Sequence, residues 1–209
     1  VVVAVAALFV ILGIQENRQE ESYVEIEALQ EDVTTWLGDG SAEGGVEAET
    51  DTPDREAEGA ELIARAEQIA DRYPRAYAAA RAAMIRGKVQ WELEAWREAA
   101  ESYSEVATVD PGSYLAPVGL MHAAMAYENA GMTEEAAASL RRIVDEYGDA
   151  SADAPRALFS LGRISEQQGD LAEASARYNQ LIERYPSSSW TNFARDRILL
   201  LTAQGRIGE

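Results

Sequence analysis

The sequence predicts an all-α fold in which pairs of antiparallel helices stack into a right-handed solenoid, preceded by a transmembrane helix. Three observations lead to this prediction. Helical patterns end at Pro74, Pro111, Gly148 and Pro186, at spacings of 37, 37 and 38 residues. Within each repeat a small residue, an alanine and a large residue recur at matching offsets. The chain also opens with 14 residues that carry no polar side chain.

The composition of the 209-residue chain excludes several classes of function. Lys and Arg number 18 against 37 Asp and Glu, and a formal charge of −19 argues against nucleic acid as a partner. The lack of cysteine and the single histidine, His122, exclude thiolate nucleophiles, disulfides and multi-histidine metal sites. The sequence has no Gly-rich phosphate loop and no nucleophile motif. We therefore expect a binding protein and not an enzyme, without catalytic residues, metal or cofactor.

Residues 1–14 are predicted to be a transmembrane anchor. A helix of this length spans about 21 Å, whereas the hydrocarbon core of a bilayer is about 30 Å thick. Residue 1 is valine and not methionine, so we expect further apolar residues upstream. A signal peptide and a buried core helix are the alternatives. No cleavage site of small residues follows the apolar run, and an all-apolar helix suits a solenoid poorly.

The residues after the anchor indicate its orientation. Between Gln15 and Glu61 only Arg18 and Arg55 are positive, against 16 acidic residues. Cytoplasmic flanks usually carry the excess of Lys and Arg, so this side is expected to be extracytoplasmic.

Residues 15–37 are predicted to continue the anchor as an amphipathic helix. Apolar residues recur there at spacings of three and four, at Tyr23, Ile26, Leu29 or Gln30, Val33 and Leu37. Glycines then end the helix, and residues 38–58 are expected to be a flexible acidic linker, rich in Gly, Glu, Asp and Thr. The linker lacks the alternating carboxylate spacing of a calcium loop.

Four positions of the repeat predict how its helices pack. Small residues allow two helices to approach closely, and an alanine with a large residue four positions later fills one face of the second helix. The small residues are Gly87, Ala124 and Gly162, and the alanines are Ala99, Ala136 and Ala174. The large residues are Tyr103, Leu140 and Tyr178, and the aliphatic residues that follow them are Val106, Ile143 and Leu181. Gly131 and Gly169 close the turn inside a pair, where the first repeat has Glu94.

The solenoid is predicted to occupy residues 59–204. Helix pairs are expected at 76–92/95–108, 115–130/133–147 and 154–168/171–184.

Single helices are predicted at both ends of the solenoid. Leu62, Ala66 and Ile69 have the spacing of another second helix, whose partner would be residues 22–37 or nothing. A C-terminal capping helix covers the last pair, and residues 205–209 form a tail. The residues of the capping helix that carry its pattern are Trp190, Phe193, Ala194, Ile198 and Leu201.

On these residues the chain resembles the tetratricopeptide repeat family. The third repeat carries the resemblance best, through Leu158, Leu161, Gly162, Gly169, Ala174, Tyr178, Leu181 and Pro186. The first repeat departs from the pattern, with Arg86 where Leu is usual and Gln90 where an aromatic residue is usual. The resemblance covers about residues 59–204 and implies a scaffold that binds proteins.

The long repeat and the single anchor are similar to those of membrane-anchored bacterial envelope proteins of this family. Such proteins include the ancillary subunit of the Sec translocon, the cell-division coordinator of the Tol–Pal system and the outer-membrane assembly lipoprotein. The resemblance implies a single-pass protein of the bacterial inner membrane with its repeats on the periplasmic side. Of these proteins, the ancillary subunit of the translocon fits the anchor best, and the partners would be proteins of translocation or envelope assembly. An anchored repeat protein of no assigned pathway is the alternative.

The resemblance also implies that ligands bind along the concave face formed by the first helix of each pair. Positive residues and methionines gather there, which suggests an extended peptide segment with apolar and some acidic side chains. The candidate residues are Arg81, Met84, Lys88, Trp91, Val118, Met121, His122, Met125, Arg156, Phe159 and Arg163. Alternatively, the positive side chains balance nearby carboxylates, and the methionines and Trp91 with Trp96 serve packing. His122 has no motif that would supply a nucleophile.

Two functions stay open on the sequence. The first is a membrane-anchored interaction module that holds partner proteins on the extracytoplasmic face. The second is a permanent structural subunit, or spacer, of a larger envelope complex.

Overall fold

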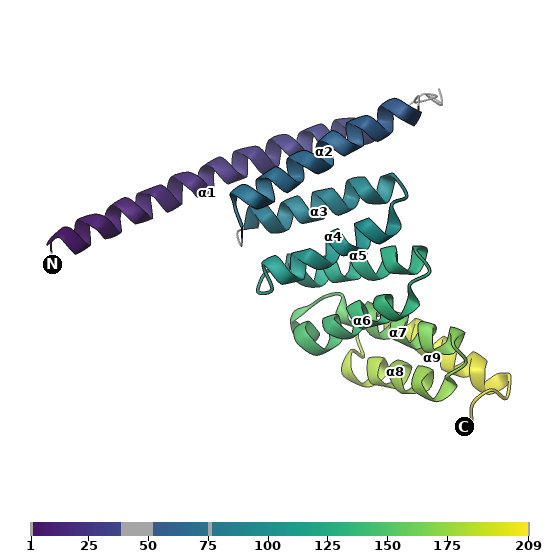
Figure 1. The fold of residues 1–209 in the computed structure, drawn as a ribbon. Coiled ribbons are helices and arrows are strands. Elements are labelled where there is room, and N and C mark those ends of the chain that lie inside the picture. Colours follow the sequence, from purple (N-terminus) through teal and green to yellow (C-terminus); the bar gives the residue numbers. More distant parts are fainter. Residues whose placement is uncertain (1, 39–51, 75–76, 209) are drawn as a thin grey trace. The chain divides into compact units, whose positions relative to one another are not determined.

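The computed structural model describes residues 2–38, 52–74 and 77–208, and the side chains of residues 18–38, 55–74 and 77–208. Every regular element in these residues is helical (Figure 1). The chain divides into two compact units, Val1–Pro111 and Gly112–Glu209. The predicted right-handed superhelix concerns the whole array and stays a prediction.

The first unit holds four helices: α1 (Val2–Leu37), α2 (Thr52–Arg72), α3 (Tyr77–Glu92) and α4 (Trp96–Val109). Each packs on the next along the chain, and α1 also contacts α3. The predicted pair 76–92/95–108 is confirmed to within one residue at each end.

Helix α1 supplies the partner that α2 needs. Ile26, Leu29 and Val33 are buried in one apolar cluster with Leu62, Ala66 and Ile69 of α2. This confirms residues 22–37 as the missing first helix, and it selects Leu29 over Gln30 as the buried residue. At the other end of the contact, the Arg55 guanidinium lies 4.4 Å from the Trp36 ring centroid, and each side chain donates to the other's carbonyl.

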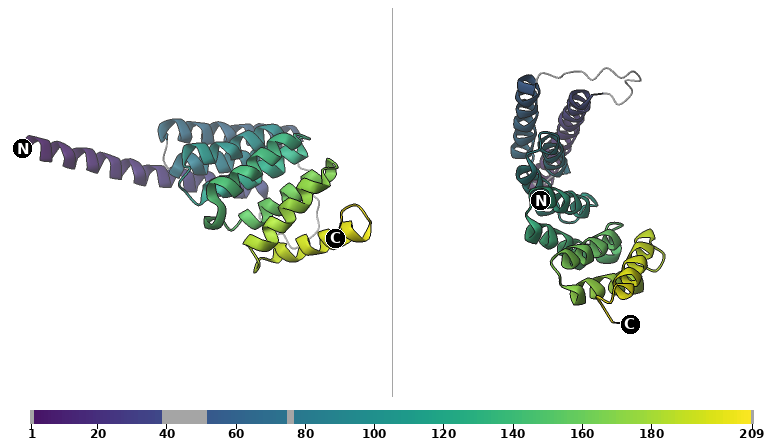
Figure 2. Two further views of the ribbon diagram at one scale, coloured as in Figure 1. Left: turned by 90° about the horizontal axis from the view of Figure 1, so that it is seen from below. Right: turned by 90° about the vertical axis from the view of Figure 1, so that its right-hand side faces the viewer.

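The predicted anchor belongs to the same helix. Helix α1 runs without a break from Val2, and its first turns extend past the other helices of the unit (Figure 2). Among the residues whose side chains are described, no helix has the length and apolar character to cross a bilayer. Residues 1–14, where the anchor is predicted, lie outside that set.

The acidic linker is shorter than the predicted range 38–58. Helix α2 begins at Thr52, so residues 52–58 are helical. Thr52 followed by Pro53 is a typical helix start, because the ring of proline presets the backbone and its missing N–H is not needed there. Residues 39–51, the rest of the predicted linker, lie outside the described residues.

The second unit holds two helix pairs and a cap: α5 (Leu115–Asn129), α6 (Thr133–Arg142), α7 (Ala154–Gln167), α8 (Leu171–Arg184) and α9 (Ser189–Ala203). The predicted pairs agree to within a residue or so, except at the end of α6. There a π-helix (Ile143–Tyr147) and a short 3₁₀ turn (Gly148–Ala150) follow, and Asp149 accepts from Arg184 at 2.8 Å. Gly148 has φ +40°, a conformation that the prolines ending the other repeats cannot adopt.

The small position of the repeat sits under an aromatic ring. A β-carbon on Gly162 would lie 2.4 Å from the nearest atom of the Tyr178 ring, and one on Gly87 2.7 Å from Tyr103. In the middle repeat Ala124 and Leu140 are both buried. The predicted close approach of the two helices of a pair is therefore confirmed in the first and third repeats, where glycine lies under tyrosine. The middle repeat has alanine and leucine at the same two positions.

The turn inside each pair requires a left-handed backbone. Gly131 and Gly169 have φ of +73° and +83°, and Glu94 holds the same place at +57°. Within the described residues Glu94 is the one non-glycine with positive φ.

We expect Glu94→Gly to stabilise the protein by about 0.5–1 kcal/mol. The left-handed conformation costs a non-glycine residue about 1–2 kcal/mol, part of which is offset by the greater freedom of glycine in the unfolded chain. Urea unfolding measures the change. The reciprocal change Gly169→Glu should destabilise by a similar amount, and a loss of stability in Glu94→Gly would contradict the argument.

Arg86 and Gln90, the departures of the first repeat, form one polar network between α3 and α4. Arg86 Nε donates to Ser102 Oγ at 2.8 Å, and its Nη2 binds Glu105. Ser102 Oγ in turn donates to Gln90 Oε1 at 2.5 Å. The Arg86 side chain is only 16% exposed, so the network satisfies a charge that would otherwise be buried without a partner.

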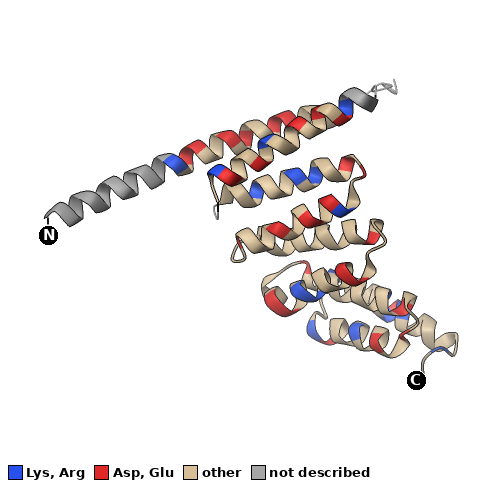
Figure 3. Ribbon diagram, viewed as in Figure 1, with Lys and Arg blue, Asp and Glu red and all other residues tan. Residues whose placement is uncertain are grey.

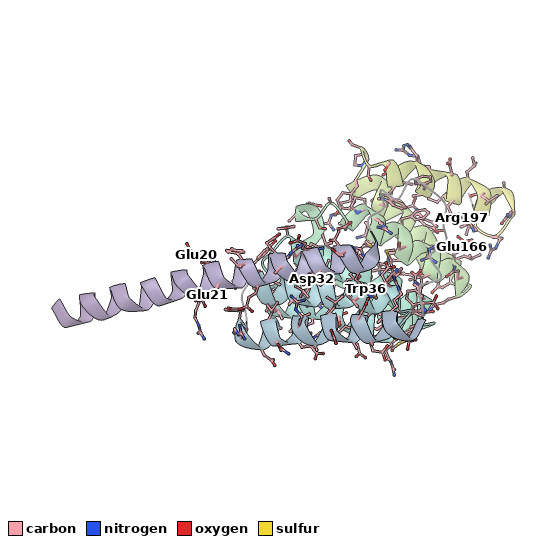
Figure 4. All side chains as sticks on the ribbon, turned by 90° about the horizontal axis from the view of Figure 1, so that it is seen from above. Glu20, Glu21, Asp32, Trp36, Glu166 and Arg197 are labelled. Atoms are coloured by element: carbon pink, nitrogen blue, oxygen red, sulfur yellow. The ribbon has the colours of Figure 1, made fainter. Side chains whose placement is uncertain are left out.

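The cap helix α9 is held by an ion cluster around one buried carboxylate. Glu166 accepts from Arg197 at 2.7 and 2.5 Å and from Arg206 at 3.4 Å (Figure 4). Its side chain is 7% exposed. The hydrogen bonds from Arg197 lower the pKa of Glu166, against the opposing effect of burial. Ala194 and Leu201 complete the inner face of α9 as predicted, together with Thr191.

Candidate partner-binding surface

The candidate residues predicted from the sequence are distributed over three helices in two units. Helix α3 of the first unit carries Arg81, Met84, Lys88 and Trp91. Helices α5 and α7 of the second unit carry the others.

The four residues on α3 differ in their contacts and in their burial. Arg81 donates to Gln30 of α1 at 3.3 Å, and Met84 is half-buried. Trp91 packs edge-on against Trp96 with ring centroids 4.8 Å apart, which agrees with the packing role considered for both residues from the sequence. Lys88 is exposed and forms no salt bridge with the described part of the chain.

On α5 the prediction needs one correction. Met121 is 4% exposed and belongs to the core, because it faces inward between the buried Leu120 and Ala123. His122 and Met125 are half-buried, as is Val118. Burial lowers the pKa of His122, and the positive charge of Arg156 lowers it further, while Asp153 partly opposes the shift. The net effect favours the neutral form of the imidazole.

The two arginines of α7 differ in their surroundings. Arg163 pairs with Glu128 of α5 through bonds of 2.5 and 2.6 Å, so its charge is balanced. This agrees with the alternative interpretation of the sequence, in which the positive side chains balance nearby carboxylates. Arg156 forms no salt bridge with any described residue. Its Nη2 lies 3.3 Å from Met125 Sδ, and its guanidinium carbon lies 5.9 Å from the Trp190 ring centroid.

Next to Arg156 three aromatic side chains form an aromatic corner, which consists of Phe159, Trp190 and Phe193. The Phe159 ring centroid lies 5.3 Å from that of Trp190 and 6.1 Å from that of Phe193, and those two are 5.6 Å apart. Phe159 also lies 5.6 Å from the buried Tyr178. Phe193 is 54% exposed, so this corner presents aromatic surface to solvent.

The structure thus brings together Met125, Arg156 and Phe159 of the predicted set and adds Trp190 and Phe193. Sequence reasoning placed the last two in the cap. They are three residues apart and therefore share a helix face, which is a signal available from the sequence. The contact between α9 and α7, in contrast, has no signal in the sequence.

Acidic residues recur along α2 and along the described second half of α1, with few positive residues between them (Figure 3). The described residues contain no group of three or more potential metal-binding side chains. The arrangement around Arg156 suits recognition of a partner, because it combines a cation, a thioether and an aromatic cluster of which Phe193 is exposed.

Comparisons with known proteins agree with a repeat fold. Residues 122–189 match the sequence profile of a family described as "Tetratricopeptide repeat". A "TPR repeat-containing protein" of Treponema pallidum is 32% identical over 149 residues, which cover 69% of this chain and 60% of that protein. "Cellulose synthase operon protein C" of Pseudomonas fluorescens is 29% identical over 164 residues, 73% of this chain and 12% of that protein. The chain therefore spans less than two thirds of the length of either relative.

Proposed function

We propose that this chain, whose residues 122–189 match the tetratricopeptide repeat, is a scaffold that binds other proteins on the extracytoplasmic face of a bacterial inner membrane. Repeats of this kind generally bind proteins or peptides. Partners that act in protein translocation or envelope assembly would suit this role.

The aromatic corner is the observation that carries the interaction role. Phe193 is 54% exposed although it lies in a cluster of rings, and the half-buried Arg156 borders the same cluster. Exposed apolar surface rimmed by polar groups marks binding sites, and aromatic and arginine side chains dominate binding energy. We assign partner binding to this surface of the second unit.

Membrane anchoring is the second part of the proposal. The apolar run 1–14 and the acidic residues that follow it support a span with the repeats outside the cytoplasm. Its test removes residues 1–17 and keeps residues 18–37, which α2 needs as its packing partner. The full chain should stay in the membrane pellet after a carbonate wash, and the shortened chain should not. Unchanged association would contradict the anchor.

A permanent structural subunit is the alternative function, and α9 offers an observation in its favour. Leu199 is 69% exposed and Leu200 42%, so the cap carries apolar surface of its own. A solenoid built into a larger complex would bury such residues.

Photo-crosslinking in intact membranes distinguishes the two functions. A photoreactive phenylalanine analogue at position 193 samples the aromatic corner, and the same analogue at position 199 samples the other exposed face of α9. We expect crosslinks to partner proteins from position 193, at substoichiometric yield and varying with growth conditions. Leu199 is the matched control.

The opposite pattern would favour the alternative. A constant, near-stoichiometric crosslink from position 199 with none from position 193 supports the structural subunit. Crosslinks from neither position would refute both assignments for this unit.

A further inference from the structure

We infer that the surface around Arg156 selects protein segments in which an Asp or Glu side chain is flanked on both sides by apolar residues. The inference rests on the proposed function, because it names the kind of segment that the same surface would bind.

The charge of Arg156 is the first argument. Five arginines of the second unit are half-buried, and four of them pair with a carboxylate. Those four are Arg142, Arg163, Arg177 and Arg197. Arg156 has no such partner among the described residues, in a chain with twice as many acidic as basic residues. An arginine without a carboxylate in such a protein is suited to receive one from outside.

The neighbours of Arg156 are the second argument. Its guanidinium contacts the Met125 sulfur and lies near the Trp190 ring, so apolar groups replace part of its water. Burial and the charge of Arg156 lower the pKa of His122 on α5, which disfavours a second positive charge beside Arg156. Asp153 lies one turn before Arg156 and acts on His122 without forming a salt bridge to Arg156. A charge-assisted bond is stronger in such surroundings than on an open surface.

The position of Arg156 identifies the source of the carboxylate. Arg156 lies on α7 and contacts α5 through Met125 and α9 through Trp190. Apolar groups therefore stand on both sides of it. If a bound segment places one apolar side chain on Met125 and another on the aromatic corner, the residues between them lie next to Arg156. Since successive residues of an extended chain advance about 3.3 Å, the acid lies one or two residues from its apolar neighbours. An internal residue provides a carboxylate only through its side chain.

Peptide display tests the inference with the full chain. One library carries random dodecapeptides between Gly-Ser linkers, and a second presents them with a free C-terminus. We expect the first library to yield segments with Asp or Glu between apolar residues. Replacing that acid by Asn or Gln in a selected synthetic peptide should weaken binding to the unaltered protein about tenfold to a hundredfold.

Two variants locate the effect on the protein. Arg156→Gln should remove the enrichment of acidic residues and keep that of apolar ones. Arg163→Gln, on the same helix but already paired with Glu128, should leave the selected motif unchanged. Thermal unfolding checks that both variants are folded, and the comparison of acidic and amidated peptides needs no variant.

The possible failures are separable. Selected peptides without an internal acid, or a preference for a free C-terminal carboxylate, would overturn the inference and leave the proposed function intact. If neither library yields a peptide that Phe193→Ala weakens, the proposed binding surface itself is wrong.

Discussion

Replacing Gly162 by alanine is expected to destabilise the protein by about 2 kcal/mol. The added methyl group would lie 2.4 Å from Tyr178 Cε1, and both α7 and α8 must shift to relieve the overlap. Overpacking of this kind costs about 1–3 kcal/mol or more, while the better helix propensity of alanine returns up to about 1 kcal/mol. Denaturant unfolding of the full chain measures the difference.

The middle repeat supplies the compensating change. It has Ala124 and Leu140 at the positions of Gly162 and Tyr178. The double variant Gly162→Ala/Tyr178→Leu should therefore recover much of the lost stability, although it loses the 3.4 Å contact between Tyr178 and Glu166. A double variant that is no more stable than Gly162→Ala alone would show that the ring is not the obstacle.

Removal of Arg197 is expected to destabilise the protein by about 2 kcal/mol at pH 7. The change leaves Glu166 buried with Arg206 at 3.4 Å as its remaining basic partner. Loss of one member of a buried pair costs about 3–5 kcal/mol, and we take a smaller figure because Arg197 is 40% exposed. Arg195→Ala, on the exposed side of α9, is the control and should have little effect.

The same pair gives a dependence on pH. Because Arg197 lowers the pKa of Glu166 in the folded protein, the pair stabilises above the pKa of an unfolded glutamate, about 4.3. This contribution is lost as the pH falls through the lowered pKa. The stability difference between the parent and Arg197→Ala should thus be largest near pH 7 and shrink below about pH 4. A difference that grows with acidity would contradict the role assigned to Glu166.

Periodicity predicted the helix boundaries well, because it reports which face of each helix is buried. The prediction that residues 22–37 or nothing would be the partner of α2 came from elimination: residues 62–69 needed a helix to pack against, and the composition of the linker excluded one there. The same reasoning did not find the start of α2 at Thr52, since the composition of residues 52–58 resembles that of the linker before it. The π-helix at the end of α6 has no periodic signal either.

The binding surface was less predictable for a physical reason. The offset from Gly162 placed Arg156, Phe159 and Arg163 on one helix, but whether a charge is balanced depends on another helix. Glu128 of α5 neutralises Arg163, while Met125 is what meets Arg156. Trp190 and Phe193 join this surface because α9 packs beside α7, a contact between segments that the repeat pattern does not relate.

The continuity of α1 has a mechanical consequence. The helix that contains the apolar run is also the one whose Ile26, Leu29 and Val33 are buried in the first unit, with no flexible joint between the two parts. From residue 14 to Ile26 the helix rises about 18 Å, which sets a fixed distance between the apolar run and the packed helices. Rotation of the run about its axis would turn α2 and α3 with it. One residue inserted between positions 15 and 20 would rotate them by about 100°. Helix α1 is therefore a rigid connection between the apolar run and the packed helices, and not a flexible linker.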